Sequence, residues 1–228
     1  MSNFKAVLFD VDGTLYNQTA LRTKMSVKIL LDFFASPFTA WRNINVIKYY
    51  RYAQEILREK KIYSAANGEG QIKLTSQLSG TDEKTVKEII SKWFEEIPLD
   101  VIPGCKRKDL EKTFEWLYKN GFKIGLYSDY DCIDKARVLK IDKYISVYVS
   151  SEDVSVGVFK PDPKGFLVAS EKLGFFPDKI LYVGDRAEVD LIGANAAGMK
   201  TALFGKLPDG DKYNFEIKDL SDIIKFLN

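Results

Sequence analysis

Histidine is absent from the 228-residue sequence. This absence excludes Ser-His-Asp and Cys-His nucleophilic sites, and any zinc site that needs histidine ligands. Cysteine is scarce, and the spacing of Cys105 and Cys132 matches no metal-binding motif. We therefore expect two reduced thiols rather than a disulfide. Any chemistry has to use carboxylates, lysine, arginine, hydroxyl groups or a bound metal.

Long apolar runs and a strong charge imbalance are also missing. No run approaches the ~20 apolar residues that span a bilayer, and the N-terminus shows no signal-peptide pattern. The formal net charge of +2 gives little attraction to nucleic acid or to a membrane. We expect a cytoplasmic protein without nucleic-acid or membrane partners, as a monomer or weak homodimer. The hydrophobic fraction, 46%, is ample for a core.

The stretch from Lys5 to Leu15 stands out because a short apolar run ends in acids. Residues 7–9 predict a strand that is buried on both faces, as in a parallel sheet. Asp10 and Asp12 follow it, and Gly13 breaks the run. Carboxylates beside a core are costly unless they are paired or bind a cation, and Mg²⁺ prefers such oxygen ligands. We therefore expect a catalytic site at this strand end.

The rest of the chain divides by its periodicity. Between residues 17 and 97 we find no convincing strand, and apolar spacing predicts helices over 26–34, 41–57, 71–78 and 81–94, with a loop at 64–70. From residue 98 onward, strands and helices alternate. The predicted strands are 122–127, 144–149, 180–183, 201–204 and 215–217, and the predicted helices are 108–120, 131–139, 164–173, 189–197 and 220–227.

This alternation predicts an α/β fold, a Rossmann-like parallel sheet with helices on both faces. The sheet domain comprises residues 1–16 and 98–228, and an all-helical cap domain, residues 17–97, is inserted after the first strand. Ligands of open parallel sheets bind at the carboxyl ends of the strands. The helical insert should therefore lie over Asp10 and Asp12 as a lid.

Polar residues recur where the predicted strands end. They are Asp10 and Asp12, Ser128, Lys160 before a proline-rich helix start, and Asp185 with Asp190. Each has an ordinary explanation alone, such as a capped turn, a turn hydroxyl or a solvated lysine. Together at one sheet edge they suit a Mg²⁺ ion, held by acids, and a phosphate group, held by lysine and hydroxyl.

With these motifs the chain resembles the haloacid dehalogenase superfamily of phosphohydrolases. The resemblance lies in Asp10-Val11-Asp12-Gly13-Thr14-Leu15, Ser128, Lys160-Pro161-Asp162-Pro163 and the run from Gly184 to Asp190, in that order. The position of the helical insert is similar to that in the subgroup of phosphoglycolate phosphatases and β-phosphoglucomutases. Asp129 is a departure, because the superfamily often has asparagine there.

The resemblance implies a role for each matching residue. Asp10 would attack phosphorus and Asp12 would act as acid and base, with Thr14 orienting the acid loop. The resemblance further implies that Mg²⁺ is held by Asp10, the main-chain carbonyl of Asp12 and Asp185, with Asp190 either binding the metal or orienting its ligands. It also implies that phosphate is bound by Ser128, the Asp129 main chain and Lys160.

We therefore predict a Mg²⁺-dependent phosphatase that hydrolyses small phosphorylated metabolites through an aspartyl-phosphate. A phosphomutase for sugar phosphates is one alternative, weakened by the lack of histidine, and a catalytically silent binding protein of the same fold is another. Substrate choice should come from the helical insert. The first half of the insert is basic. Either these charges form a solvated helical face, or one arginine, Arg22 or Arg42, binds a second anionic group of the substrate. The aromatic residues within 35–41 could add a wall to the crevice.

Overall fold

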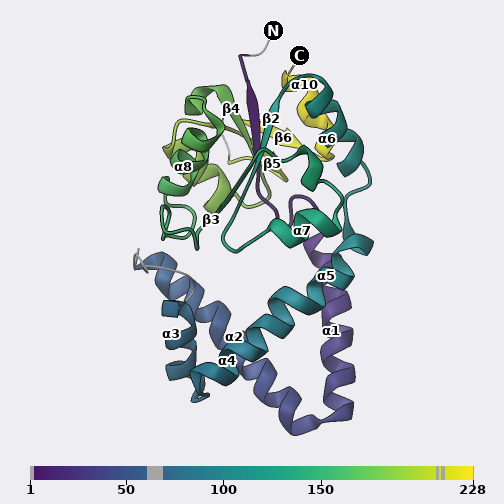
Figure 1. The fold of residues 1–228 in the computed structure, drawn as a ribbon, viewed down its shortest axis with the longest axis vertical. Coiled ribbons are helices and arrows are strands. Elements are labelled where there is room, and N and C mark those ends of the chain that lie inside the picture. Colours follow the sequence, from purple (N-terminus) through teal and green to yellow (C-terminus); the bar gives the residue numbers. More distant parts are fainter. Residues whose placement is uncertain (1–2, 61–68, 209–210, 212–213, 228) are drawn as a thin grey trace.

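The computed structural model describes residues 3–60, 69–208, 211 and 214–227. Figure 1 shows a sheet with flanking helices in the upper part and a group of longer helices in the lower part. Both chain ends lie at the top, on the side of the sheet that faces away from these helices. Within the described residues, no helix combines the length and the apolar character needed to cross a membrane.

Six parallel strands form one sheet in the order β3-β2-β1-β4-β5-β6. Their bounds are β1 Ala6–Phe9, β2 Lys123–Ser128, β3 Val147–Ser150, β4 Ile180–Gly184, β5 Lys200–Phe204 and β6 Phe215–Ile217. The strand β1 is central, with β2 on one side and β4 on the other. The predicted parallel α/β fold is confirmed. The third strand begins later than expected because Asp142–Tyr144 forms a 3-10 turn.

The two faces of the sheet carry separate apolar layers. Val7 and Phe9 of β1 point into one layer with α6 (Leu110–Lys119), while Ala6 and Leu8 point into the other with α8 (Lys164–Leu173). This alternation is the two-residue period of a strand that is buried on both faces. The remaining helices of this part are α7 Ile133–Val138, α9 Ile192–Ala196 and α10 Ile224–Leu227.

In the described part of the chain, five α-helices of the insert lie between β1 and α6, which leads into β2. They are α1 Gln18–Ala35, α2 Pro37–Glu59, α3 Glu69–Ser79, α4 Glu83–Ile90 and α5 Ile97–Val101. The helix α1 begins eight residues earlier than predicted, because the Asn17 side chain caps it by accepting a hydrogen bond from the Ala20 N–H. Of the predicted loop at 64–70, residues 64–68 lie outside the described residues, and Glu69 and Gly70 belong to α3.

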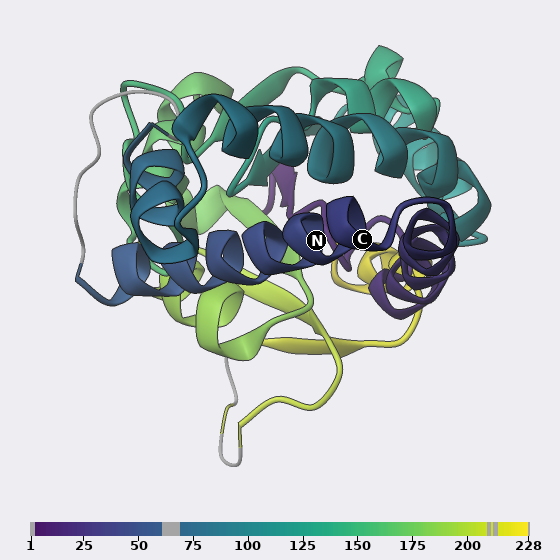
Figure 2. The same cartoon turned by 90° about the horizontal axis from the view of Figure 1, so that it is seen from below.

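A helical run continues from α4 through a π-helical turn, Ser91–Glu96, into α5. Pro98 is compatible with this run because it occupies the first turn of α5, where its missing N–H is not needed. The boundary that we predicted between residues 97 and 98 falls inside α5, and the division into two domains stays a prediction. Figure 2 shows α2 and this run spread across the lower edge of the sheet.

The turn between α1 and α2 lies at the far end of the helical insert and exposes large apolar side chains. Phe34, Phe38 and Trp41 are 75%, 88% and 67% exposed. Our expectation of an aromatic wall over the crevice is therefore wrong for residues 35–41. They lie at the tip of a long helical hairpin, and the hairpin carries them away from the sheet.

Candidate active site

The carboxyl ends of β1, β2 and β4 form one side of a cavity of about 910 Å³. Because these strands are neighbours in the sheet, Asp10, Ser128 and Asp185 come together although the chain separates them widely. Asp10 and Lys160 lie on the floor of the cavity, and residues of α1, α2 and the α4–α5 run form its walls. The sequence-predicted site residues therefore line one cavity, with the exceptions of Thr14, which is buried behind Asp10, and Arg42.

Asp10 and Lys160 form a buried ion pair at the floor of this cavity. The Lys160 Nζ lies 2.6 Å from Asp10 Oδ1, and only 3% of the lysine side chain is exposed. Burial alone would lower the pKa of Lys160, but the Asp10 and Asp190 carboxylates raise it well above its usual range. Lys160 therefore stays charged beside Asp10.

Asp190 is fully engaged by hydrogen bonds. Its Oδ1 accepts from Lys160 Nζ at 3.0 Å and from the Tyr182 hydroxyl at 2.8 Å. Its Oδ2 accepts from the main-chain N–H groups of Asp185 and Arg186 at 3.2 and 3.1 Å. With four donors on two oxygens, this carboxylate is suited to holding Lys160 and the turn after β4 in place.

Asp185 contrasts with Asp190 because one of its buried oxygens, Oδ1, has no hydrogen-bond partner among the residues that the structure describes. Burial and the neighbouring Asp190 raise the pKa of Asp185 to about 6. Gly13 lies directly against this carboxyl group: a Cβ built on Gly13 would come within 2.0 Å of Asp185 Oδ2. Glycine is also required there by its φ of +104°.

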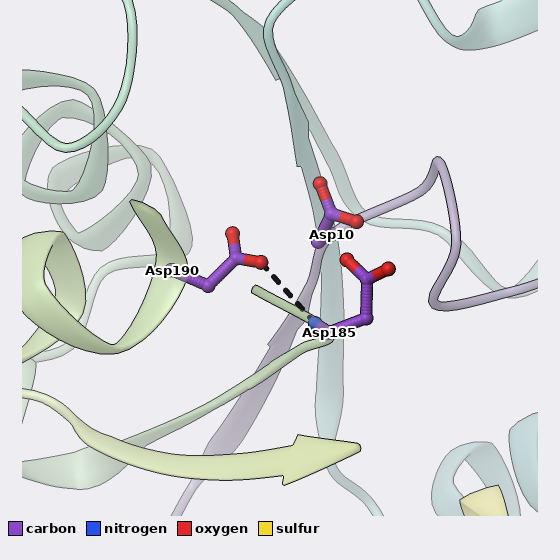
Figure 3. Close-up of side chains that lie close together, drawn as sticks. All are labelled: Asp10, Asp185 and Asp190. Atoms are coloured by element: carbon purple, nitrogen blue, oxygen red, sulfur yellow. Dashed lines mark hydrogen bonds between the residues drawn. The ribbon is translucent and has the colours of Figure 1, made fainter. Parts of the chain in front are cut away.

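The carboxyl groups of Asp10, Asp185 and Asp190 converge, each offering one oxygen within 4.8 Å of the others. Figure 3 shows Asp10 at the end of β1, Asp185 at the end of β4 and Asp190 on the short π-helix Ala187–Leu191 that follows. Burial, Asp190 and Asp185 raise the pKa of Asp10 well above its usual range, against the opposing effect of Lys160. An unpartnered buried oxygen among crowded carboxylates is the donor set that a hard divalent cation fits.

The Asp12 side chain points to a different partner. Its two oxygens accept from Lys135 Nζ at 2.7 and 2.9 Å, and Oδ1 also accepts from the Tyr16 hydroxyl. Burial would raise the pKa of Asp12, but the Lys135 ammonium lowers it below its ordinary value. Sequence reasoning missed Lys135, because a lysine within a surface helix carries no motif.

The loop between β1 and α1 is held from two sides. The Thr14 hydroxyl donates to Asp10 Oδ2 at 3.0 Å, so Thr14 contacts the first acid directly. The Arg107 guanidinium donates to the main-chain oxygens of Thr14 and Gly13, at 2.7 and 2.8 Å. Arg107, which also stacks on Phe204, was not singled out in the sequence, since its partners are main-chain groups 93 and 94 residues away.

Ser128 and Asp129 follow β2 at the edge of the cavity. Ser128 is buried, and its hydroxyl faces the N–H of Tyr130 at 3.4 Å. The Asp129 carboxylate instead lies 2.8 Å from the Arg58 guanidinium of α2. Its side chain is therefore directed toward the helical insert, and our expectation of phosphate binding concerns only its main chain.

Two arginines of the helical insert, Arg22 of α1 and Arg51 of α2, line the cavity. Within the described part of the chain, neither guanidinium forms an ion pair. Burial and the nearby Arg22 lower the pKa of Arg51. Arg42, the other residue that we predicted to reach the crevice, is exposed on α2 and lies outside the cavity. It sits one turn from the hairpin tip, which explains why that expectation is wrong.

Comparison with known proteins finds sequence similarity to phosphatases and a fold shared with a dehalogenase. It is 30% identical over 239 residues to a glyceraldehyde 3-phosphate phosphatase from Methanopyrus kandleri, covering 98% of each chain. It is 24% identical to a phosphoglycolate phosphatase from Salmonella typhi, over 87% of this chain and 80% of that one. The structure of a 2-haloacid dehalogenase from Pseudomonas syringae shares the fold, with a TM-score of 0.69 over 98% of each chain at 22% identity.

A family model agrees with these similarities. It is described as haloacid dehalogenase-like hydrolase and matches residues 4–198, which contain β1, the helical insert and every acid of the site. The resemblance seen in the sequence is thereby confirmed: this chain is a hydrolase that belongs to the haloacid dehalogenase-like family.

Proposed function

We propose that the protein is a Mg²⁺-dependent phosphatase that hydrolyses small phosphate monoesters through an aspartyl-phosphate. The observation that carries this proposal is the buried Asp10 carboxylate, placed between the Lys160 ammonium and two further acids at the floor of a cavity. Similarity to named phosphatases over almost the whole chain supports the same reaction.

In the first step, an oxygen of Asp10 attacks phosphorus and the bond from phosphorus to the ester oxygen breaks. Asp12 gives its proton to the leaving alkoxide. In the second step, Asp12 takes a proton from water, the water oxygen bonds to phosphorus, and the Asp10–phosphorus bond breaks. Phosphate is released and Asp10 is regenerated.

Lys135 affects these two steps differently. By keeping Asp12 ionised, it prepares this carboxylate to take the proton from water. Asp12 must carry a proton when the alkoxide leaves, and the contact with Lys135 opposes that state. We therefore expect the Asp12 carboxyl group to leave Lys135 when substrate binds.

The metal would be held by the Asp10 and Asp185 side chains and the Asp12 main-chain carbonyl. Asp190 would orient Lys160 and the turn after β4, since its oxygens already accept four hydrogen bonds. Bound Mg²⁺ supplies positive charge for the transferring phosphoryl group. The Ser128 hydroxyl, the Asp129 main-chain N–H and the Lys160 ammonium would bind the phosphoryl oxygens as their charge develops.

We further propose that the preferred substrate carries a second anionic group. Arg22 and Arg51 line the same cavity, where the charge of Arg22 acts on Arg51, and among the described residues neither forms an ion pair. A carboxylate or a second phosphate would relieve their repulsion and accept their hydrogen bonds. Phosphoglycolate has such a group and glyceraldehyde 3-phosphate does not. The two named relatives therefore represent the two possible kinds of substrate, one with and one without a second anionic group.

A panel of phosphorylated metabolites, assayed for released phosphate with and without Mg²⁺, tests the proposal. We expect hydrolysis of p-nitrophenyl phosphate that requires the metal, faster hydrolysis of phosphate esters that carry a second anionic group, and loss of activity in Asp10→Asn. Activity that survives this substitution would contradict the role of Asp10. Phosphate moved between two positions of one sugar would favour a mutase, and ligand binding without turnover would favour a silent binding protein.

A further inference from the structure

The Asp129 carboxylate joins three separate parts of the chain. Its Oδ2 accepts from Arg58 Nη2 at 2.8 Å and from Gln54 Nε2 at 3.2 Å, both on α2. Its Oδ1 accepts from the Ser151 hydroxyl after β3 and from the Lys160 main-chain N–H, each at 3.2 Å. Only 13% of the side chain is exposed.

Arg58 closes this arrangement from the other side. Its Nε donates to the main-chain oxygen of Lys160 at 2.7 Å, its Nη1 pairs with Glu55, and its side chain is 9% exposed. Burial acts to lower the pKa of Arg58, but Asp129 and Glu55 raise it, so the guanidinium stays charged. Lys160 is therefore held at its N–H by Asp129 and at its C=O by Arg58.

These contacts explain why aspartate, rather than asparagine, stands at position 129. A carboxylate accepts hydrogen bonds on both oxygens, whereas an amide accepts on one side and donates on the other. Asparagine would turn its NH₂ group toward one of the two donor pairs and would leave Arg58 with the exposed Glu55 in place of its buried counter-charge. The fixed guanidinium fork of Arg58 likewise reaches two acceptors at once, which a lysine ammonium at the same place does not.

We propose that Arg58 and Asp129 are positioning residues, a pair through which the helical insert fixes the main chain of Lys160 and so aims its ammonium at Asp10. The inference rests on the proposed phosphatase reaction for its kinetic consequence. The active-site cation then depends on α2, 102 residues away in sequence, and not only on the loop that carries it. Misplacement of a catalytic group by about 1 Å costs on the order of 10²-fold in rate.

The test compares kcat and KM of Arg58→Ala, Arg58→Lys, Asp129→Asn and the double variant Arg58→Ala/Asp129→Asn with wild type. The control is Lys119→Ala, which breaks the exposed pair with Glu115 on α6.

We expect kcat to fall about 10²-fold in Arg58→Ala and about tenfold in the other two single variants, with KM changed by less than about threefold. The double variant should be no slower than Arg58→Ala, because both changes break one arrangement. The control should match wild type.

Hydrogen exchange gives a readout that does not depend on turnover. Loss of the pair should speed exchange of the Lys160 N–H in peptides covering residues 158–162, in Asp129→Asn as well as in Arg58→Ala.

If wild type hydrolyses no phosphate ester, the proposed function fails while this exchange measurement still decides the positioning role. Folded variants with kcat within twofold of wild type, multiplicative losses in the double variant, or unchanged exchange would each overturn the inference. If Arg58→Ala does not fold, Arg58→Lys and Asp129→Asn carry the same comparison.

Discussion

The edge of the sheet and the helical insert supply the cavity with residues of different character. At the sheet edge, Asp10, Lys160 and Asp190 are nearly inaccessible and bond to one another. In the insert, Arg22 and Arg51 are exposed and, among the described residues, form no ion pair. Buried, mutually bonded groups are suited to one fixed reaction, whereas exposed cations without a paired acid leave room for a ligand.

This difference suggests a division of work between the two regions. The sheet edge would set the reaction, and the insert would set which phosphate ester reaches it. Arg58 is the exception, because it belongs to the insert but is buried against the loops of the sheet edge. Substitutions at the sheet edge and substitutions in the insert should therefore affect different measurements.

The largest effect is expected at Lys160. Lys160→Met leaves Asp10 and Asp190 buried without their cation, so we expect a loss of about 3–5 kcal/mol in the free energy of unfolding, as well as loss of phosphatase activity. Chemical denaturation measures this loss. Lys172→Met on α8, which breaks an exposed pair with Asp153, should cost less than about 1 kcal/mol. Equal stabilities for the two variants would contradict the buried ion pair.

Metal binding should weaken as pH falls below about 6, because protons then compete for Asp185, whose folded pKa is raised from 3.8 to that value. Each further pH unit should lower the affinity for Mg²⁺ roughly tenfold in calorimetric titrations. Without metal, the folded state holds this proton more tightly than the unfolded state, so this group's contribution to stability falls as pH rises from about 4 to about 6. Asp185→Asn should remove this group's part of both dependences, and a Mg²⁺ affinity that is constant between pH 5 and 7 would argue against this ligand.

Arg22→Ala and Arg51→Ala should each raise KM for a substrate with a second anionic group by about tenfold, the loss of one charge-assisted hydrogen bond. KM for p-nitrophenyl phosphate should change little, because this substrate lacks such a group. Arg42→Ala is the matched control, since it removes an arginine of the same insert that lies outside the cavity. If all three variants behave alike, the cavity arginines do not select substrate.

The smallest effect is expected at Lys135. Lys135→Met removes the charge that lowers the pKa of Asp12, so the limb of the pH–rate profile that reports Asp12 should move to higher pH. The stability that ionised Asp12 contributes is present above its unfolded pKa and is lost as pH falls through its lower folded pKa. Lys135→Met should remove this contribution. An unshifted profile would show that Asp12 does not titrate beside Lys135 during turnover.

The sequence by itself determined the fold and the edge of the sheet where the acids meet. Short apolar runs end at Asp10, Ser128 and Gly184-Asp185, and parallel strands carry their carboxyl ends to one edge. The position of α8 agreed exactly with the prediction, because Pro163 precedes its first turn and Gly174 ends it in the left-handed region.

Only the tertiary structure decided which residues of the helical insert reach the cavity. Helical periodicity predicts a buried face but not the direction in which a long hairpin points, so Arg42 and the aromatic residues 35–41 were misplaced and Arg51 was missed. The roles of Lys135, Arg107 and Arg58 as partners of site residues could not be predicted from the sequence for the same reason. Each acts on a group 71 to 123 residues away, and such contacts depend on how the helices pack rather than on any local pattern.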